Sequence, residues 1–184
     1  MSNSVCPWWM GYFLINPLRR IIQNPKKILS DYVSDEMNVL EIGSGMGFFS
    51  IPLAQMVGAK GHVLSVDLQQ RMLESLKKRI NKSGLTDTIE IHKCAADSLL
   101  IDSFTGKFDF ALAFAVVHEV PDQGRLFKEI YAALKKGGKV LVAEPKGHVS
   151  DSELDKSVAL AKKEEFEFMC KPFINSSRSV LLKK

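Results

Sequence analysis

Gly43, Gly45 and Gly47 alternate with other residues, among them Ser44, directly after the apolar run at residues 39–42. An apolar run, a glycine turn and then an amphipathic segment predict a buried strand, a tight turn and the start of a helix. Glycine permits positive φ and lets a ligand lie against bare backbone, and the first N–H groups of the helix face that ligand. The segment therefore predicts a cofactor site.

The spacing of the glycines and the charge beside them bear on which cofactor fits. A dinucleotide turn needs G-x-G-x-x-G, and Phe48 stands where its third glycine would be. Glu41 places a carboxylate just before the turn, where it repels a pyrophosphate and attracts a cation. The turn therefore favours S-adenosylmethionine, which carries a sulfonium and an ammonium. An NAD(P)-dependent oxidoreductase is the alternative.

Asp67 is the next candidate, because it ends the second predicted strand. Ligands of open α/β sheets bind beyond the carboxyl ends of the strands. A carboxylate about 20 residues past the glycine turn can accept hydrogen bonds from both hydroxyls of a ribose. The other interpretation is an N-cap of the following helix, and the two are compatible.

His118 follows the fourth predicted strand and is the candidate acid–base residue. A histidine there can take a proton from an oxygen or nitrogen nucleophile, and a packing role is the alternative. His62, His92 and His148 stand at strand or loop edges and are interpreted as surface residues.

Short apolar runs predict five strands, at 38–42, 62–66, 88–93, 109–114 and 138–144, with helical patterns between them. Two further strand candidates, 165–170 and 178–183, are close enough in sequence to pair antiparallel. We therefore predict an α/β fold. Its sheet is doubly wound, seven-stranded and mostly parallel, with a C-terminal antiparallel hairpin.

The predicted helices each bring apolar residues to one face. These are Met72, Leu73, Leu76 and Ile80 in one helix, Leu126, Phe127, Ile130 and Leu134 in another, and Leu154, Val158 and Ala161 in a third. The first of these helices is expected to stop at Ser83-Gly84. Ser150 and Glu153 form a capping-box pattern at the start of the third.

Residues 1–36 are predicted to form a helical flap over the mouth of the sheet, and residues 37–184 the sheet domain. Asn16-Pro17 and Asn24-Pro25 each predict a helix N-cap with proline at the first helical position. Residues 28–33 supply an inward face to the second of these helices. The flap also contains four aromatic residues that can form an apolar lid over a substrate, namely Trp8, Trp9, Tyr12 and Phe13.

Two other interpretations of the aromatic flap are open. Such residues more often pack in a core, and with Arg19-Arg20 behind them they can also rest on a bilayer interface. A non-catalytic cofactor-binding or membrane-surface module is therefore a second alternative function.

Composition narrows the classes of protein further. The chain has 184 residues, of which 46% are hydrophobic, enough for one globular domain with a full core. Its net charge of +4 is scattered, whereas a nucleic-acid footprint needs a dense basic stripe. No run approaches the ~20 apolar residues of a membrane span, and no signal peptide is expected.

The three cysteines, Cys6, Cys94 and Cys170, are odd in number and lack C-x-x-C spacing. Neither a disulfide framework nor a metal site is expected, and a reducing cytoplasm fits.

The glycine turn, Asp67, the segment 108–122 and the segment 134–139 together resemble the class I S-adenosylmethionine-dependent methyltransferases, over roughly residues 36–184. The resemblance is closest to the small-molecule branches of ubiquinone/menaquinone biosynthesis and of arsenite methylation, whose cofactor domain is Rossmann-like. It implies methyl transfer from S-adenosylmethionine to a small-molecule acceptor by in-line displacement. The protein then mainly positions the nucleophile and excludes water, and only a poorly ionised nucleophile needs a base such as His118.

The resemblance also implies roles for individual residues. Asp67 would bind the ribose and Leu68 would lie on the adenine. Relatives often have an aspartate at the position of Ala95, so the contact to the adenine amino group is expected from Asp97 and from the Ala96 backbone N–H. The methionine ammonium would be held by Glu41, Phe114 and Ala115. Arsenite-methylating relatives use converging cysteines; ordinary packing of Cys6 and Cys94 is the preferred interpretation here.

Overall fold

The computed structural model describes residues 19 and 22–184. The described chain divides into two compact units, an N-terminal unit that ends at Cys94 and a C-terminal unit that spans Ala95–Lys184. The predicted flap boundary at residue 36 stays a prediction, because residues 1–18, 20 and 21 lie outside the described residues. The predicted lid residues, Trp8, Trp9, Tyr12 and Phe13, and the Asn16-Pro17 cap lie there too.

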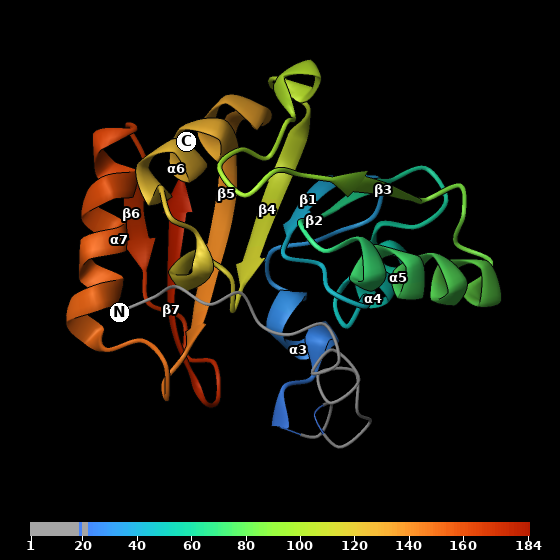
Figure 1. The fold of residues 1–184 in the computed structure, drawn as a ribbon, viewed down its shortest axis with the longest axis horizontal. Coiled ribbons are helices and arrows are strands. Elements are labelled where there is room, and N and C mark those ends of the chain that lie inside the picture. The colour runs from blue at the N-terminus through green and yellow to red at the C-terminus, as the bar shows by residue number, and fades with distance from the viewer. Residues whose placement is uncertain (1–18, 20–21) are drawn as a thin grey trace. The chain divides into compact units, whose positions relative to one another are not determined.

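The N-terminal unit contains three parallel strands in the order β3-β2-β1 (Figure 1). Its elements, in chain order, are α3 (Pro25–Leu29), β1 (Asn38–Ile42), α4 (Ser50–Val57), β2 (His62–Asp67), α5 (Gln70–Ser83) and β3 (Ile89–Lys93). The predicted apolar face of α5 is buried throughout, and the helix ends at Gly84 in the left-handed conformation. These predictions are confirmed.

Helix α3 begins as its sequence predicts but is shorter than expected. The Asn24 side chain accepts hydrogen bonds from the backbone N–H groups of Lys26 and Lys27 at 3.0 and 3.4 Å, and Pro25 follows it. Because the helix ends at Leu29, the buried Val33 reaches the core from the turn that follows. The inward face at 28–33 is therefore only partly helical.

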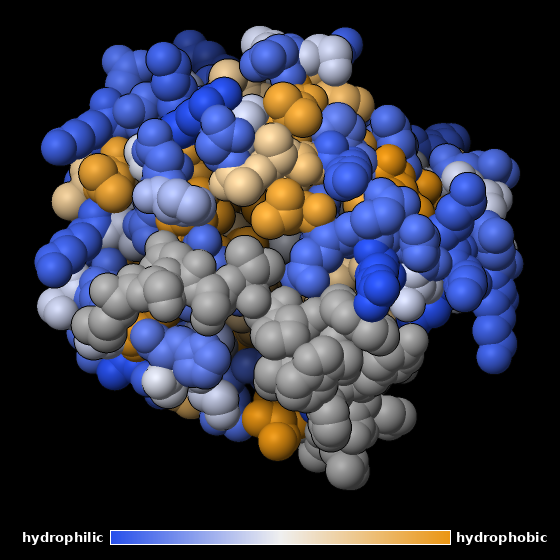
Figure 2. All heavy atoms as spheres, in the orientation of Figure 1, coloured by the Kyte–Doolittle hydropathy of each residue, from blue (hydrophilic) through white to orange (hydrophobic). Residues whose placement is uncertain are grey.

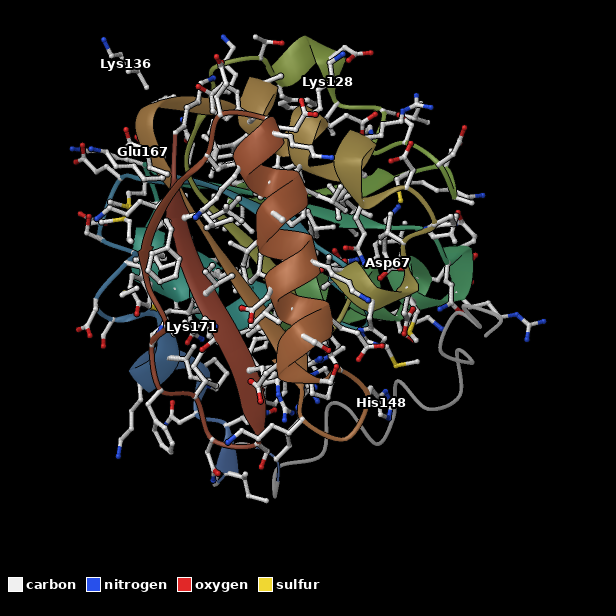
Figure 3. The ribbon with its side chains drawn as sticks, turned by 90° about the vertical axis from the view of Figure 1, so that its left-hand side faces the viewer. Asp67, Lys128, Lys136, His148, Glu167 and Lys171 are labelled. Atoms are coloured by element: carbon white, nitrogen blue, oxygen red, sulfur yellow. The ribbon has the colours of Figure 1, made fainter. Side chains whose placement is uncertain are left out.

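The C-terminal unit contains four strands in the order β4-β5-β7-β6. Its elements are β4 (Phe108–Phe114), α6 (Gln123–Ala133), β5 (Leu134–Pro145), α7 (Asp151–Lys163), β6 (Glu167–Cys170) and β7 (Ser177–Lys183), with two short 3-10 turns, η2 (Asp102–Phe104) and η3 (Val117–Glu119). Strand β4 pairs with β5 in parallel, and β7 pairs antiparallel with β5 and β6. Figure 3 shows α7 lying along β7. The predicted seven-stranded, mostly parallel sheet with a C-terminal antiparallel hairpin is confirmed.

The prediction that Leu134 continues the apolar face of α6 is wrong. Leu134 takes an extended conformation directly after Ala133 and begins β5, where it pairs with Phe108 of β4. It is fully buried at the start of the strand. A buried apolar residue at the end of a helix therefore does not reveal from sequence alone where the strand takes over.

Helix α7 begins with the predicted capping box between Ser150 and Glu153, and its predicted inward residues, Leu154, Val158 and Ala161, are buried.

Hydrophilic side chains dominate the face of the molecule drawn in Figure 2. None of the helices in the described part of the chain is long and apolar enough to cross a membrane.

Candidate functional site

The glycine turn joins β1 to α4 in the N-terminal unit. The backbone N–H groups of Gly43 and Ser44 both donate to the Val66 carbonyl, at 2.9 and 3.0 Å, so the end of β2 anchors the start of the turn. Gly43, Gly45 and Gly47 have φ values of 71°, 54° and 85°, a region that side chains strongly disfavour. The predicted order of strand, glycine turn and helix is therefore present.

Two of these glycines are needed for different reasons. A Cβ added at Gly47 would lie 2.4 Å from Leu76 Cδ1, so the missing side chain lets the turn approach α5. A Cβ added at Gly45 would meet no described atom within 4 Å. The Gly45 backbone therefore borders open space in which a ligand can lie against it.

Ser44 lies between Gly43 and Gly45 and is buried in the turn. The residue is 5% exposed, and its hydroxyl oxygen has no hydrogen-bond partner among the described residues. Buried polar groups in native proteins nearly always have a partner. An unsatisfied hydroxyl beside bare glycine backbone fits a polar ligand such as the amino-acid part of S-adenosylmethionine.

Asp67 lies at the end of β2, as predicted, and is labelled in Figure 3. One carboxylate oxygen accepts the Gly45 N–H at 2.7 Å, and the other accepts the Gln69 N–H at 2.8 Å, just before α5. Burial raises the pKa of the carboxyl. Asp67 therefore joins the glycine turn to the residue that precedes α5. The interpretation of Asp67 as the N-cap of this helix is wrong, because Gln69 holds the N-cap position and α5 has no side-chain capping bond. The contact of Asp67 with a ribose, and that of the half-buried Leu68 with an adenine, stay predictions.

Glu41 is buried in β1, one residue before the strand ends, with 3% of its surface exposed. Its register partner on β2 is Ser65, whose hydroxyl donates to the Glu41 carboxylate at 2.8 Å. The Ser50 hydroxyl, at the first residue of α4, donates to the same oxygen at 2.5 Å. Burial raises the pKa of Glu41 to about 7, against the opposing effect of the two hydroxyls. The acid can therefore change its charge near neutral pH.

The raised pKa of Glu41 predicts a pH dependence of stability. Because protonation is favoured in the folded state, the contribution is present below the unfolded pKa of 4.5 and is lost as the pH rises through about 7. We expect unfolding in urea to require about 3 kcal/mol less free energy at about pH 8 than at about pH 5 on account of this group. In Glu41→Gln this part of the change in unfolding free energy with pH should be missing. An equal change with pH in the two proteins would show that Glu41 does not titrate in this range.

Ala96 and Asp97 lie in an exposed loop of the C-terminal unit. The Asp97 side chain is 74% exposed and pairs with Arg125 of α6 at 3.4 Å. The loop is held by Glu129, which accepts from the Ser98 hydroxyl at 2.7 Å and from the Leu99 N–H at 2.6 Å. Sequence reasoning missed Glu129, because nothing on its helix distinguishes it from a surface acid. The adenine contacts of Ala96 and Asp97 stay predictions.

Phe114 ends β4 and Ala115 follows it directly, at the strand end where the sequence predicts residues that border a ligand. Phe114 is 8% exposed. Ala115 has φ of 57°, and its N–H donates to the Ala143 carbonyl at 2.7 Å. A residue other than glycine in this conformation costs energy and is often found at functional sites. The predicted contact of their carbonyls with an ammonium is not tested by these observations.

His118 lies in the turn η3 of the same unit and has a partner that sequence reasoning missed. Its Nδ1 is hydrogen-bonded to a carboxylate oxygen of Glu144 in β5, and this bond raises the pKa of His118. The other oxygen of Glu144 accepts the Val117 N–H at 2.8 Å. The one sequence clue was an acid inside an otherwise apolar strand. His148 is exposed, as predicted, and its ring packs edge-on to His118 with 5.6 Å between the centroids.

The described residues include no group of three or more His, Cys, Asp or Glu that could hold a metal ion. Cys94 is half-buried in the N-terminal unit, Cys170 is exposed on β6, and neither forms a disulfide with another described residue. Cys6 lies outside the described residues.

Comparison with known proteins agrees with this arrangement. A demethylmenaquinone methyltransferase of Lactobacillus johnsonii is 32% identical over 105 residues, which are 57% of this chain and 42% of that protein. An arsenite methyltransferase of Aquipseudomonas alcaligenes is 30% identical over 114 residues, 60% of this chain and 33% of that protein. The matches thus span less than half the length of these curated relatives.

The fold is shared with solved structures. The crystal structure of a SAM-dependent methyltransferase from Aquifex aeolicus matches with a TM-score of 0.87 and 21% identity, covering 97% of this chain and 99% of that one. A family model described as a methyltransferase domain matches residues 33–176, most of the chain. The chain therefore belongs to the methyltransferase-domain family, as the resemblance of its motifs to the class I S-adenosylmethionine-dependent enzymes predicted.

Proposed function

We propose that the chain binds S-adenosylmethionine at the glycine turn and transfers its methyl group to a small-molecule acceptor by in-line displacement. The observation that carries the proposal is the unsatisfied, buried hydroxyl of Ser44 beside the open backbone of Gly45. The cofactor supplies an activated methyl group, so the chain's own residues need only bind it, orient the acceptor and exclude water.

Two carboxylates give the turn its preference for a cation. Glu41 and Asp67 are both buried beside it, at 3% and 8% exposure. In this proposal Asp67 accepts hydrogen bonds from the ribose, and Glu41 balances the charge of the ammonium. Binding of a cation would favour the ionised form of Glu41 and so lower its raised pKa.

Two residues at the turn argue against NAD(P). A pyrophosphate there would meet the Glu41 carboxylate rather than an uncharged backbone. Phe48 fills the position of the third glycine, is buried, and packs edge-on against Phe49 with 5.1 Å between the ring centroids. An oxidoreductase of the dinucleotide type is therefore the weaker candidate.

The names of the relatives suggest two kinds of acceptor, a quinol and arsenite. Arsenite chemistry needs several converging thiols, and the described residues, which include Cys94 and Cys170, contain no group of three or more His, Cys, Asp or Glu that could hold a metal ion. A small organic acceptor is therefore the better fit. We also propose the cytoplasm as the compartment, since neither described cysteine forms a disulfide with another described residue.

Methyl transfer can be tested directly with S-adenosylmethionine that carries a deuterated methyl group. The purified chain is incubated with reduced demethylmenaquinone, with arsenite, or with a small-molecule extract of the source cells. The masses of the products are then measured by mass spectrometry. We expect a small molecule to gain the labelled methyl group in step with formation of S-adenosylhomocysteine. Binding without any transfer would instead favour the non-catalytic alternative.

A further inference from the structure

Glu144 holds two consecutive residues of η3 with its two carboxylate oxygens. The side chain is 2% exposed in the centre of the C-terminal unit. One oxygen accepts the Val117 N–H at 2.8 Å, and the other is bonded to Nδ1 of His118. Burial of an acid costs free energy, and the hydrogen bonds to both of its oxygens hold the Glu144 carboxylate in one orientation. It therefore fixes the imidazole ring relative to the end of β4.

The bond to Glu144 also fixes where the proton of His118 lies. A carboxylate oxygen only accepts, so Nδ1 must donate and the neutral ring keeps its lone pair on Nε2. The His118 side chain is 24% exposed, and among the described residues the ion-pair partner of Nε2 is the carboxylate of Glu119, 4.0 Å away. Nε2 is therefore the nitrogen left to act on another molecule.

We propose that His118 removes a proton from the methyl acceptor through Nε2 and that Glu144 is the residue that positions it for this task. The inference rests on the proposed methyl transfer and deepens it, because it names the class of acceptor. The acceptor carries an ionisable hydroxyl or amine proton, as a quinol, an enol or an amine does. An acceptor that reacts through a lone pair and has no proton to lose would not need His118 and Glu144.

The step is balanced without any further reactant. The acceptor's oxygen, nitrogen or activated ring carbon forms a bond to the methyl carbon as the bond from that carbon to sulfur breaks. The electron pair of the broken bond stays on sulfur, which becomes a neutral thioether. The acceptor's proton moves to Nε2, and the resulting imidazolium is stabilised by Glu144 until the proton passes to water.

Other charged groups near His118 act in the same direction but more weakly. Glu119 and Glu153 contribute to the raised pKa of His118, after the hydrogen bond and charge of Glu144, while partial burial opposes them. His148 packs against the ring but has no hydrogen bond to it. A raised pKa means that the neutral, base-active form of His118 predominates only at higher pH than for an ordinary histidine.

Glu144→Gln separates the positioning role from a merely structural one. The amide oxygen can still accept the Val117 N–H, but the amide NH₂ would face Nδ1 and force it to accept, which moves the ring proton to Nε2 and removes the base. Glu119→Gln is the matched control, because it removes a nearby charge without touching the Nδ1 bond. His118→Ala with added imidazole tests the base itself.

Initial rates of labelled methyl transfer are measured against pH for each variant, with reduced demethylmenaquinone and the small-molecule extract as the acceptors. We expect Glu144→Gln and His118→Ala to lose about 100-fold or more in kcat, the range typical of general-base catalysis, with imidazole restoring part of the loss in His118→Ala. Glu119→Gln should stay within about threefold, since it leaves the base intact. Titration with S-adenosylhomocysteine verifies that each variant is folded and binds normally.

A second measurement does not depend on turnover. Nitrogen-15 NMR of the full chain should show neutral His118 protonated at Nδ1 in the wild type and at Nε2 in Glu144→Gln, with a lower pKa in the variant. Wild-type protonation at Nε2 would overturn the inference. So would unchanged rates in both variants, or transfer to arsenite alone, while the proposed function would stand. A wild-type chain that methylates nothing would overturn the proposed function and this inference together.

Discussion

Replacing Gly45 with valine should abolish binding of S-adenosylhomocysteine while leaving the chain folded. Gly45 has φ of 54° and borders space in which an added Cβ meets no described atom within 4 Å. The cost to folding is therefore mainly that of a side chain in the left-handed region, about 1–2 kcal/mol. The cost to binding is larger, because the isopropyl group would occupy the volume in which the ligand lies against the backbone.

Gly106→Val is a matched control for this substitution. Gly106 has φ of 65°, an added Cβ there also meets no described atom within 4 Å, and the residue lies in a turn of the C-terminal unit far in sequence from the glycine turn. We expect the two variants to lose similar free energy of unfolding, and only Gly45→Val to lose more than about 100-fold in affinity by calorimetry, equivalent to about 2.7 kcal/mol. Near-normal affinity in Gly45→Val would refute the assignment of the site.

Deleting residues 1–14 should remove methyl transfer almost entirely while reducing cofactor affinity only moderately. The segment contains Trp8, Trp9, Tyr12 and Phe13, whose apolar side chains can exclude water from the reacting methyl group. Arg19, just beyond the deletion, lies with its guanidinium 4.2 Å from the centre of the ring of Phe48, the residue that follows the glycine turn.

The deletion is tested by turnover with the acceptor that the wild-type chain methylates, and by calorimetry with S-adenosylhomocysteine. The variant Trp8→Ala/Trp9→Ala, which keeps the chain length, controls for the loss of backbone. Full turnover in both variants would show that the aromatic residues have only a packing role, or that they contact a membrane instead.

The elements that position the site follow from local sequence rules. Strand β1 was predicted to the residue, because an apolar run between polar neighbours and a glycine turn has few alternative structures. The Ser150–Glu153 capping box and the end of α5 at Gly84 were predicted for the same reason, since each depends on residues that are neighbours in the chain.

Features that depend on contacts between distant segments were missed. Leu134 was expected on a helix, but pairing with Phe108 draws it into β5. Glu144 was overlooked inside an apolar strand, although its two oxygens hold a turn 26 and 27 residues earlier in the chain. The sequence could not show that the Ser44 hydroxyl lacks a hydrogen-bond partner among the described residues, because this depends on where all the neighbouring polar groups lie in the folded chain.

The most direct test of the account is a calorimetric titration of the full chain with S-adenosylhomocysteine and, in parallel, with NADH. The buried Glu41 beside the glycine turn, the Ser44 hydroxyl without a partner among the described residues, and Phe48 in place of the third glycine of a dinucleotide turn predict saturable one-to-one binding of S-adenosylhomocysteine and none of NADH. Saturable binding of NADH without binding of S-adenosylhomocysteine would contradict the account.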